Sequence, residues 1–410
     1  MHNQIFEQAL GLESPWYIKS VEFSKEDKRL DINIDFTKGS TFEYEDQGSF
    51  KAYDTIKKSW RHLNFFEHEC YINCRVPRVK LDDGKVKRIK APWEGVNSGF
   101  TLLFEALIMQ MASCMPVQNV ADIINEDDEK IWRILHKYVE RSREDIDMSE
   151  VSVIGVDETS QAKHHNYVTV FVDMNKRKTL YVTDGKDNTT VVDFVKDLEL
   201  HNGDANNITA VSSDMSPAFI KGINENLPNA TITFDRFHVM NLISKAVDEV
   251  RIEEAKTNPL LYRTKYIFLK NRINLTDKQE EFLGGTLELK KHNLKTVRAL
   301  HLRESFQAIY QATSKSDFTR LLNEWYNWAR RCRLEPMKKA ATSIKKHWDG
   351  IVSWFDSKLN NGILEGMNSV IQAAKRKARG YSTTKNYKTI IYLLTAGLDF
   401  TKINAHVKNA

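Results

Sequence analysis

The sequence lacks a long apolar run, a cysteine framework and a strong excess of one charge. No apolar stretch reaches the roughly 18 residues that a membrane-spanning helix needs. The N-terminus also lacks the basic-then-apolar order of a signal peptide. We therefore expect no membrane segment and a cytoplasmic location. The net charge of +5 is modest and by itself says little about binding partners.

Cysteines are too few and too scattered to form a disulfide framework in a chain of 410 residues, so we expect reduced thiols. Cys70 and Cys74 have the spacing of half a zinc site. No second Cys or His pair stands near them at a ligand-like spacing, and we interpret both as strand residues.

The chain has the composition of a soluble globular protein, with 41% hydrophobic and 28% charged residues, and its length predicts two or three compact units. Changes of pattern along the chain divide it further. We expect a β-rich module at 1–95, a helix-turn-helix-like region at 96–150, the first part of an α/β core at 151–250, an α-helical insertion at 251–358, and a final core helix with a basic tail at 359–410.

Strands and then helices are indicated in the first 150 residues. The runs WYIKSVEF, RLDINIDF, CYINCRVPRVKL and KVKRI, separated by turn-like segments, predict a small sheet. The segments GFTLLFEALIMQMASCMP, VQNVADII and EKIWRILHKYVERSRE then predict three helices, and the tight polar link NEDD suggests a helix-turn-helix. An apolar stripe on the last helix is typical of core and comprises Ile131, Ile134, Leu135 and Tyr138. The opposite face carries the candidate DNA contacts Arg133, His136 and Lys137, although the acidic turn before the helix argues against close contact.

Beyond Val151, short apolar runs alternate with helices. We expect strands at VSVIGV, NYVTVFVDM and KTLYVTD, a helix at TTVVDFVKDLEL, a strand at NITAVSS, a helix at SPAFIKGINEN and a strand at ATITF. Three strands in succession, followed by two that are each reached through a helix, follow the order of the ribonuclease H fold. The helical stretch from about Arg236 to Leu359 then reads as an all-α insertion into this α/β core.

Three carboxylates stand out because of their positions. Asp157 follows VSVIGV and Asp214 follows NITAVSS, so each is expected at the exit of a buried strand, where an acid needs a counter-ion such as a metal. Capping of a turn is the ordinary alternative for Asp157, and Ser216 is expected to cap the helix after Asp214. Glu365 lies on a predicted helix, where a Glu in the first turn would also simply suit the helix dipole.

The helix of Glu365 is predicted to have two faces. Its apolar stripe comprises Ile363, Met367, Val370, Ile371 and Ala374. Its polar face comprises Glu365, Asn368, Gln372, Lys375, Arg376 and Arg379. We expect Lys375, Arg376 and Arg379 to contact DNA phosphates beside Glu365, although a solvated basic surface is equally common. Further basic residues follow up to Lys408.

Phosphodiester chemistry would explain this set of acids. Two hard cations about 3.5 to 4 Å apart can activate the attacking oxygen and stabilise the leaving one, and carboxylates are their natural ligands. We therefore predict two Mg²⁺ ions, for which Mn²⁺ could substitute. Asp235 and His238 are candidate accessory residues that would hold the scissile phosphate or the displaced strand, although Asp235 as an N-cap explains them equally well. Glu158, Asp173 and Asp184 are weaker replacements for a member of the triad.

Many blocks in order resemble the bacterial insertion-sequence transposases of the ISL-three family, among them PWYIKSVEF, PWEGVNSGFTLLFEAL, GVDETS, SSDMSPAF, FDRFHVMN and LEGMNSVIQ. The resemblance implies a DDE transposase with a ribonuclease H-like core, magnesium dependence and binding to the terminal inverted repeats of its own element. It assigns the triad to Asp157 in GVDET, Asp214 in SSDMS and Glu365 in LEGMN.

The sequence departs from the family at its N-terminus. Members often carry a zinc finger with a CxxCG block and a second cysteine group after the PRV motif. Here the matching stretches read YEDQG and PRVKL, so the ligands are missing and we expect no structural zinc.

Three functions follow from these observations. The first is an active transposase that binds double-stranded DNA, both element ends and target, as a homo-oligomer, expected to be a dimer because two ends must meet. The second is a transposase-derived protein that recognises DNA without cutting it, which loss of an acid would have favoured. The third is a ribonuclease H-like nuclease without strand transfer, against which the helix-turn-helix argues.

Overall fold

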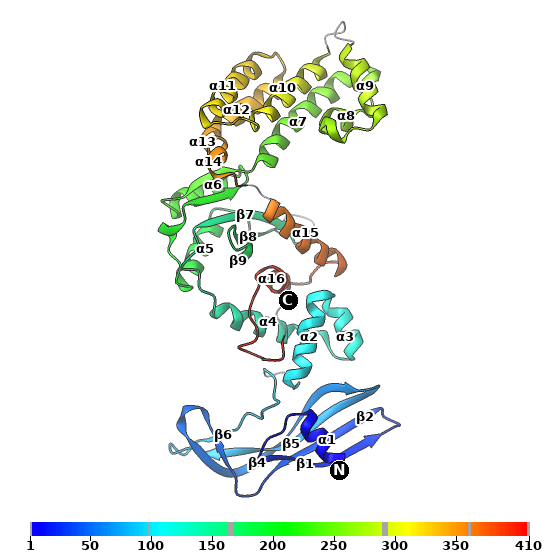
Figure 1. Cartoon of the computed structure of the whole chain (residues 1–410), viewed down its shortest axis with the longest axis vertical. Helices are drawn as coiled ribbons and strands as arrows, with labels where there is room; N and C mark the ends of the chain where they lie inside the picture. Colours follow the sequence, from blue (N-terminus) through cyan, green and yellow to red (C-terminus); the bar gives the residue numbers. More distant parts are fainter. Residues whose placement is uncertain (1, 97–98, 162–166, 289–293, 360–361, 408–410) are drawn as a thin grey trace. The chain divides into compact units, whose positions relative to one another are not determined.

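The computed structural model describes residues 2–96, 99–161, 167–288, 294–359 and 362–407, with elements labelled as in Figure 1. The chain divides into two compact units, one formed by residues 1–146 and 373–410 and the other by residues 147–372. The first dividing point lies close to the predicted boundary at 150, whereas the second falls inside a helix. Residue 166 of a predicted strand and the basic residue Lys408 lie outside the described residues.

The first unit begins with a twisted sheet of antiparallel and parallel strands (Figure 1). Its elements are α1 (His2–Ala9), β1 (Trp16–Ser24), β2 (Arg29–Phe36), β3 (Thr41–Glu43), β4 (Ser49–Phe65), β5 (His68–Lys80) and β6 (Val86–Arg88). The strand order is β1-β2-β5-β4-β3, and β6 pairs with β5. The four predicted strands β1, β2, β5 and β6 are confirmed. The sequence does not predict β4, because polar residues fill most of it and its burial follows no simple alternation.

One face of this sheet is a hydrophobic core built around tryptophans. The ring of Trp93 lies 5.3 Å from that of Trp16 and 5.8 Å from that of Trp60, measured between centroids. Cys70 and Cys74 are buried in the same core on β5, and burial raises the pKa of each thiol to about 12. Both are strand residues, as the sequence predicts.

The described part of the first unit also contains the whole helices α2 (Leu102–Cys114), α3 (Val117–Ile124), α4 (Asp128–Glu144) and α16 (Thr384–Thr395), together with the end of a helix that starts in the second unit. Between α3 and α4 the chain turns at Asn125, whose φ of 54° is left-handed, and the Asp127 carboxylate caps α4 by accepting the Glu129 N–H at 2.9 Å. The predicted apolar stripe of α4 is buried throughout. The predicted basic tail is in part a packed helix, because α16 buries Tyr387 and Ile391.

The second unit contains a five-stranded sheet with the order β11-β10-β7-β8-β9. Its strands and helices are β7 (Val153–Ser160), β8 (Tyr167–Asp173), β9 (Lys178–Asp184), α5 (Thr189–Leu200), β10 (Ala210–Ser213), α6 (Pro217–Asn226) and β11 (Thr231–Phe234). β8 is antiparallel to both β7 and β9, whereas β10 is parallel to both β7 and β11. All seven segments coincide with predicted elements, and β7 is the central strand.

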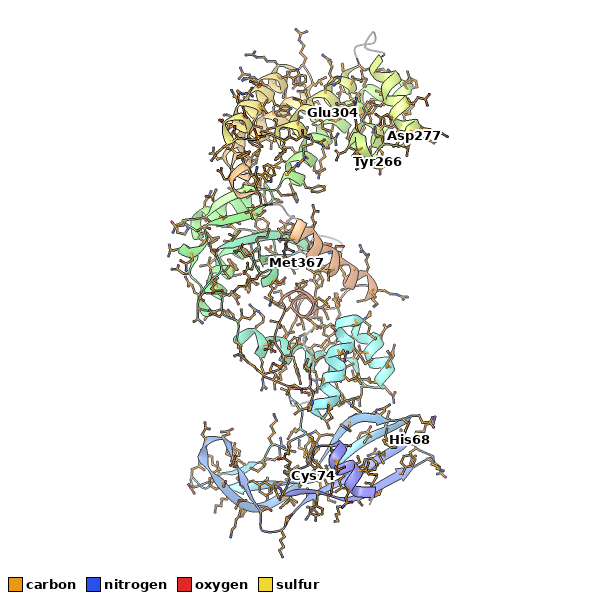
Figure 2. The ribbon with its side chains drawn as sticks, viewed as in Figure 1. His68, Cys74, Tyr266, Asp277, Glu304 and Met367 are labelled. Carbon is orange, nitrogen blue, oxygen red and sulfur yellow. The ribbon has the colours of Figure 1, made fainter. Side chains whose placement is uncertain are left out.

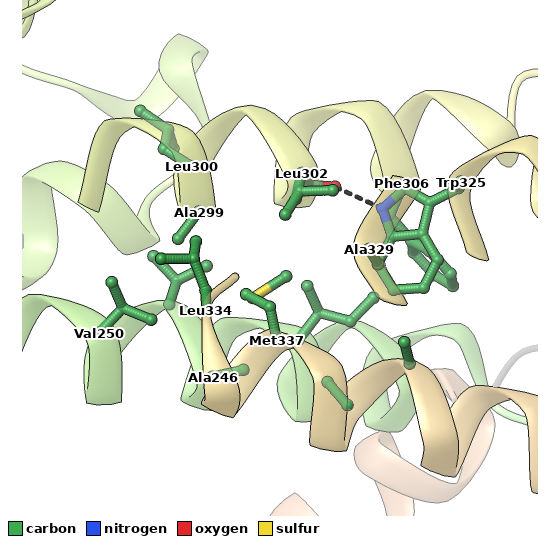
Figure 3. Close-up of a cluster of buried hydrophobic side chains, with 14 of the residues drawn as sticks. Ala246, Val250, Ala299, Leu300, Leu302, Phe306, Trp325, Ala329, Leu334 and Met337 are labelled. Carbon is green, nitrogen blue, oxygen red and sulfur yellow. Dashed lines mark hydrogen bonds between the residues drawn. The ribbon is translucent and has the colours of Figure 1, made fainter. Parts of the chain in front are cut away.

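The chain between β11 and residue 359 is helical in its described residues, as predicted. It contains α7 (Arg236–Ala255), α8 (Lys265–Leu269), α9 (Asp277–Glu288), α10 (Lys295–Ile309), α11 (Lys315–Arg331), α12 (Glu335–Lys346), α13 (Trp348–Val352) and α14 (Trp354–Ser357). Figure 3 shows the core between α7, α10, α11 and α12, where the Trp325 indole donates to the Leu302 carbonyl at 2.7 Å. No helix in the described ranges is both long and apolar enough to cross a membrane.

Candidate active site

Two carboxylates stand at matching positions on neighbouring parallel strands. The last residue pair between β7 and β10 joins Gly155 to Ser212. Asp157 and Asp214 each lie two residues beyond this pair, on the same edge of the parallel strands. One detail differs from the prediction: Asp157 is not at the end of its strand, because β7 continues along β8 as far as Ser160.

A third acid, Asp235, continues the row onto the next strand. The last pair between β10 and β11 joins Ser213 to Phe234, so Asp214 and Asp235 each follow their strand by one residue. Asp235 is also the N-cap of α7: its carboxylate accepts the N–H groups of Phe237 at 3.0 Å and His238 at 3.3 Å. The N-cap interpretation of Asp235 is therefore confirmed.

Asp214 also interacts with a helix N-terminus. Its Oδ1 accepts the Ser216 N–H at 2.9 Å, directly before α6 starts at Pro217. Ser216 occupies the N-cap position as predicted, but its hydroxyl makes no capping hydrogen bond. The Asp214 carboxylate thus binds the backbone of the N-cap residue, while the predicted capping hydrogen bond to the Ser216 side chain is absent.

The environment of Asp157 combines burial with nearby charges of both signs, since His238 lowers the pKa of its carboxyl while two acids raise it. Burial raises the pKa of the Asp157 carboxyl, and the charges of Asp214 and Asp235 act in the same direction. The neighbouring Glu158 responds similarly: burial raises its pKa, and the charge of Asp214 adds to the effect. A cation placed here would relieve this repulsion.

Helix α15 (Gly362–Lys377) packs along β7 with a matched spacing. Every fourth residue of the helix meets every second residue of the strand, because four helical residues rise about 6 Å and two strand residues about 6.6 Å. The three contacts in succession are Leu364 with Gly155, Asn368 with Asp157, and Gln372 with Thr159.

Each of these contacts is specific. A Cβ on Gly155 would lie 2.6 Å from Met174 Sδ and 2.9 Å from the Leu364 methyl carbons, so both side chains would have to shift to admit a larger residue. The Asn368 amide donates a hydrogen bond to Asp157 Oδ2, and the Asp157 Oδ1 accepts the Glu158 N–H at 2.8 Å. Asn368 therefore fixes the orientation of the Asp157 carboxylate.

The two faces of α15 differ from the prediction. Val370, expected in the apolar stripe, is 48% exposed, whereas Leu364 and Ile371 are buried. Asn368 and Gln372, expected beside the phosphate-facing cations, pack against β7 instead. The reason is that β7 presents a carboxylate and a hydroxyl to the helix, so polar side chains form part of the packed face.

Glu365 lies in the first turn of α15 and is exposed. Together with Asp235 it lines a cavity of about 760 Å³. Within residues 2–96, 99–161, 167–288, 294–359 and 362–407, no three His, Cys, Asp or Glu side chains are grouped closely enough to hold one metal ion. The structure thus places Asp157, Asp214 and Asp235 in one row, and Glu365 beside the cavity that Asp235 also lines.

The candidate DNA contacts of α4 differ in their environment. Arg133 is exposed and Lys137 is half-buried. His136 is engaged within the first unit, because its Nδ1 lies 2.8 Å from the Thr389 hydroxyl of α16, and burial lowers the pKa of its imidazole. Arg133 is therefore the most accessible of the three to a DNA phosphate.

The candidate DNA contacts at the end of α15 and just beyond it differ in exposure. Arg376 and Arg379 are exposed, whereas Lys375 is half-buried and burial lowers the pKa of its ammonium group. The next residue along, Lys377, donates to the Cys114 carbonyl at the end of α2 at 2.7 Å.

Two residues of the site, Asn368 and Gly155, are not identified as functional by the sequence. Each stands close to a predicted acid, Asn368 three residues after Glu365 and Gly155 two residues before Asp157. These spacings could have identified both residues from the sequence, since residues three apart on a helix and two apart on a strand share a face.

Comparison with known proteins finds transposases among the relatives of this chain. A family model described as transposase matches residues 154–391, and one described as the helix-turn-helix domain of transposase family ISL3 matches residues 90–139. The chain is 25% identical over 373 residues to the transposase for insertion sequence element IS1557 of Mycobacterium tuberculosis, covering 83% of this chain and 82% of that protein. It is 26% identical over 342 residues to the transposase for insertion sequence element IS1001 of Bordetella parapertussis, covering 81% and 82%. This chain belongs to the ISL3 family of transposases and carries that family's helix-turn-helix DNA-binding domain.

Proposed function

We propose that this transposase binds the terminal inverted repeats of its insertion sequence and catalyses metal-dependent cleavage and strand transfer of DNA. The catalytic acids are Asp157, Asp214 and Glu365. The observation that carries the proposal is the placement of Asp157 and Asp214 at matching positions on adjacent strands, with α15 held against the same strand by Asn368.

The chemistry of the donor groups fits a divalent metal, although the three acids are not grouped around one point in the described part of this structure. Carboxylate oxygens are the ligands that Mg²⁺ and Mn²⁺ prefer. Burial, together with the charges of Asp214 and Asp235, raises the pKa of Asp157, so a cation would be favoured there. Asp157, Asp214 and Glu365 would hold two such ions. When bound, the ions would supply activation of the attacking oxygen and stabilisation of the leaving one. Asp157 is oriented by Asn368 for this purpose.

The architecture proposed for this chemistry is a ribonuclease H-like core interrupted by the helical segment 251–358. The sheet order β11-β10-β7-β8-β9, with three antiparallel strands followed by two parallel ones, supports it. Arg133, Lys137, Lys375, Arg376 and Arg379 are the proposed DNA contacts. We propose a homo-oligomer, a dimer, because cleavage and joining involve two element ends.

The experiment that tests the function is an assay of cleavage and strand transfer with purified protein and DNA carrying the inverted repeats that flank its gene. Both activities are expected to require Mg²⁺ or Mn²⁺ and to be lost in Glu365→Gln. Specific binding of the ends without cleavage by the wild-type protein would instead identify a transposase-derived DNA-binding protein.

Replacing Asn368 with alanine should weaken catalysis without disturbing the fold. The amide that orients Asp157 is lost, and loss of a group that orients a metal ligand typically costs about 10- to 100-fold. Cleavage rates measured over a Mg²⁺ titration should show a lower maximum and a higher half-saturating concentration. Ser369→Ala, at an exposed position of the same helix, is the matched control. An unchanged Mg²⁺ titration for Asn368→Ala would contradict the role of this residue.

A further inference from the structure

The cavity beside Glu365 is lined mainly by side chains from three helical segments of the second unit. On α7, Phe237, Asn241 and Ser244 lie at helical spacing and face the cavity together with Met240. The segment after α8 adds Asn271 and Asn274, and α10 adds Arg303 and Gln307. Its volume of about 760 Å³ lies in the range of small-molecule sites.

Arg303 is an unusual lining residue because it is only 5% exposed. Its guanidinium donates to Ser244 Oγ at 3.3 Å, the Lys270 carbonyl at 3.4 Å and Asn271 Oδ1 at 3.1 Å. All three acceptors are neutral, and no carboxylate of the described ranges lies within ion-pair distance of it. A buried guanidinium whose partners are all neutral would gain from a ligand with anionic or carbonyl oxygen atoms.

The remaining lining points to the other parts of such a ligand. Phe237 is 59% exposed although it is aromatic, so its ring is available for stacking. Asn241, Asn274 and Gln307 offer amide donors and acceptors, the groups that read the edges of nucleobases. An aromatic surface, amides and a buried arginine together match a nucleotide better than a metal or an apolar molecule.

We propose that this cavity receives a nucleotide unstacked from the DNA strand that is processed at the acids, an inference that rests on the proposed function. The base stacks on Phe237 and contacts the amides, and the buried Arg303 guanidinium lines the same cavity. Glu365 and Asp235 line the same cavity, so the attached phosphate remains beside the catalytic acids. The cost of the unstacking that this requires is least for a base that is mismatched or already single-stranded.

The test uses the full chain and a short single-stranded oligonucleotide carrying 2-aminopurine, whose fluorescence falls when the base stacks. In Ca²⁺, the wild-type protein is expected to bind the probe and quench it. Phe237→Ala should weaken binding about tenfold, in line with the effect of removing a stacking side chain. Asn274→Ala, an exposed change that does not threaten the fold, should weaken it several-fold.

Matched controls lie in the same helical region. Tyr266 on α8, labelled in Figure 2, is 64% exposed and does not line the cavity, so Tyr266→Ala should leave quenching unchanged. Asn323 is exposed and does not line the cavity, so Asn323→Ala is the matched control for Asn274→Ala and should also leave quenching unchanged. Free deoxyadenosine monophosphate should compete only weakly, because the strand provides the remaining contacts.

The inference would be overturned if the wild-type protein did not quench the probe, or if quenching survived both cavity substitutions. It would also be overturned if the free nucleotide competed as strongly as the unlabelled strand, because the cavity would then be a site for free nucleotides. The cleavage assay with Glu365→Gln judges the proposed function separately, because it needs no labelled base and no cavity variant.

Discussion

Asp157→Asn is expected to lower the rate of DNA cleavage by about 10³-fold or more while leaving binding of the element ends nearly unchanged. The substitution keeps the size of the side chain and can still accept a hydrogen bond from Asn368, but it removes the charge that would hold a metal. Metal ions contribute several kcal/mol to such transition states, and each 1.36 kcal/mol corresponds to about tenfold in rate. Single-turnover cleavage and end-binding titrations would measure the two effects separately.

A carboxylate outside the row provides the control for this substitution. Asp173 ends β8 and accepts the backbone N–H groups of Asn175 and Lys176 at 2.8 and 3.0 Å, so it stabilises a turn. Asp173→Asn should change stability more than catalysis. If Asp157→Asn impaired end binding and cleavage equally, the role of Asp157 would be structural.

The Asp157→Asn variant should unfold at a higher temperature than the wild type in EDTA at neutral pH. Because the folded state raises the pKa of Asp157 above its ordinary value of 3.8, the unfolded state ionises first, and stability falls as pH rises through the window above 3.8. Asparagine removes this penalty. Melting curves in EDTA should therefore differ at pH 7 and converge below about pH 4, and Mg²⁺ should stabilise only the wild type at neutral pH.

Local pattern is sufficient to predict the elements of the second unit and the two strand acids. The alternation of apolar runs with amphipathic segments locates β7 to β11 together with α5 and α6. Asp157 and Asp214 are the residues after the runs VSVIGV and NITAVSS, although β7 itself continues to Ser160. The unpredicted strand β4 shows the limit, since its residues are held by pairing with β5 rather than by an apolar pattern of their own.

The detailed geometry of the site depends on contacts that no local pattern contains. Asn368 and Asp157 are 211 residues apart, and the residues that surround α15 come from a strand far away in the sequence. For an isolated helix, periodicity assigns Val370 to the apolar face and Asn368 to the polar one. The polar groups of β7 reverse this assignment, because a helix packs according to what its partner presents.

Gly155→Val is expected to reduce cleavage by about 100-fold with little change in end binding. A Cβ at this position would lie 2.6 Å from Met174 Sδ and 2.9 Å from the Leu364 methyl carbons, and valine adds two further methyl groups. The Met174 and Leu364 side chains must shift, and because β7 is paired with strands on both sides, we expect the larger valine to displace α15 and with it Glu365. A displacement of about 1 Å at a catalytic group can cost about 10²-fold.

A compensating change distinguishes helix displacement from general loss of stability. Leu364→Ala opens space at the point where the new methyl groups collide, so the double variant should recover part of the cleavage activity that Gly155→Val loses, although Leu364→Ala alone removes buried contacts. Gly366 lies on the same helix, and a Cβ added there would meet no neighbouring atom within 4 Å. Gly366→Ala should therefore cleave at the wild-type rate. Activities that simply multiply in the double variant would mean that Gly155 does not set the position of α15. Recovery would show that the contact between Gly155 and Leu364 positions the Asp157 and Glu365 carboxylates relative to each other.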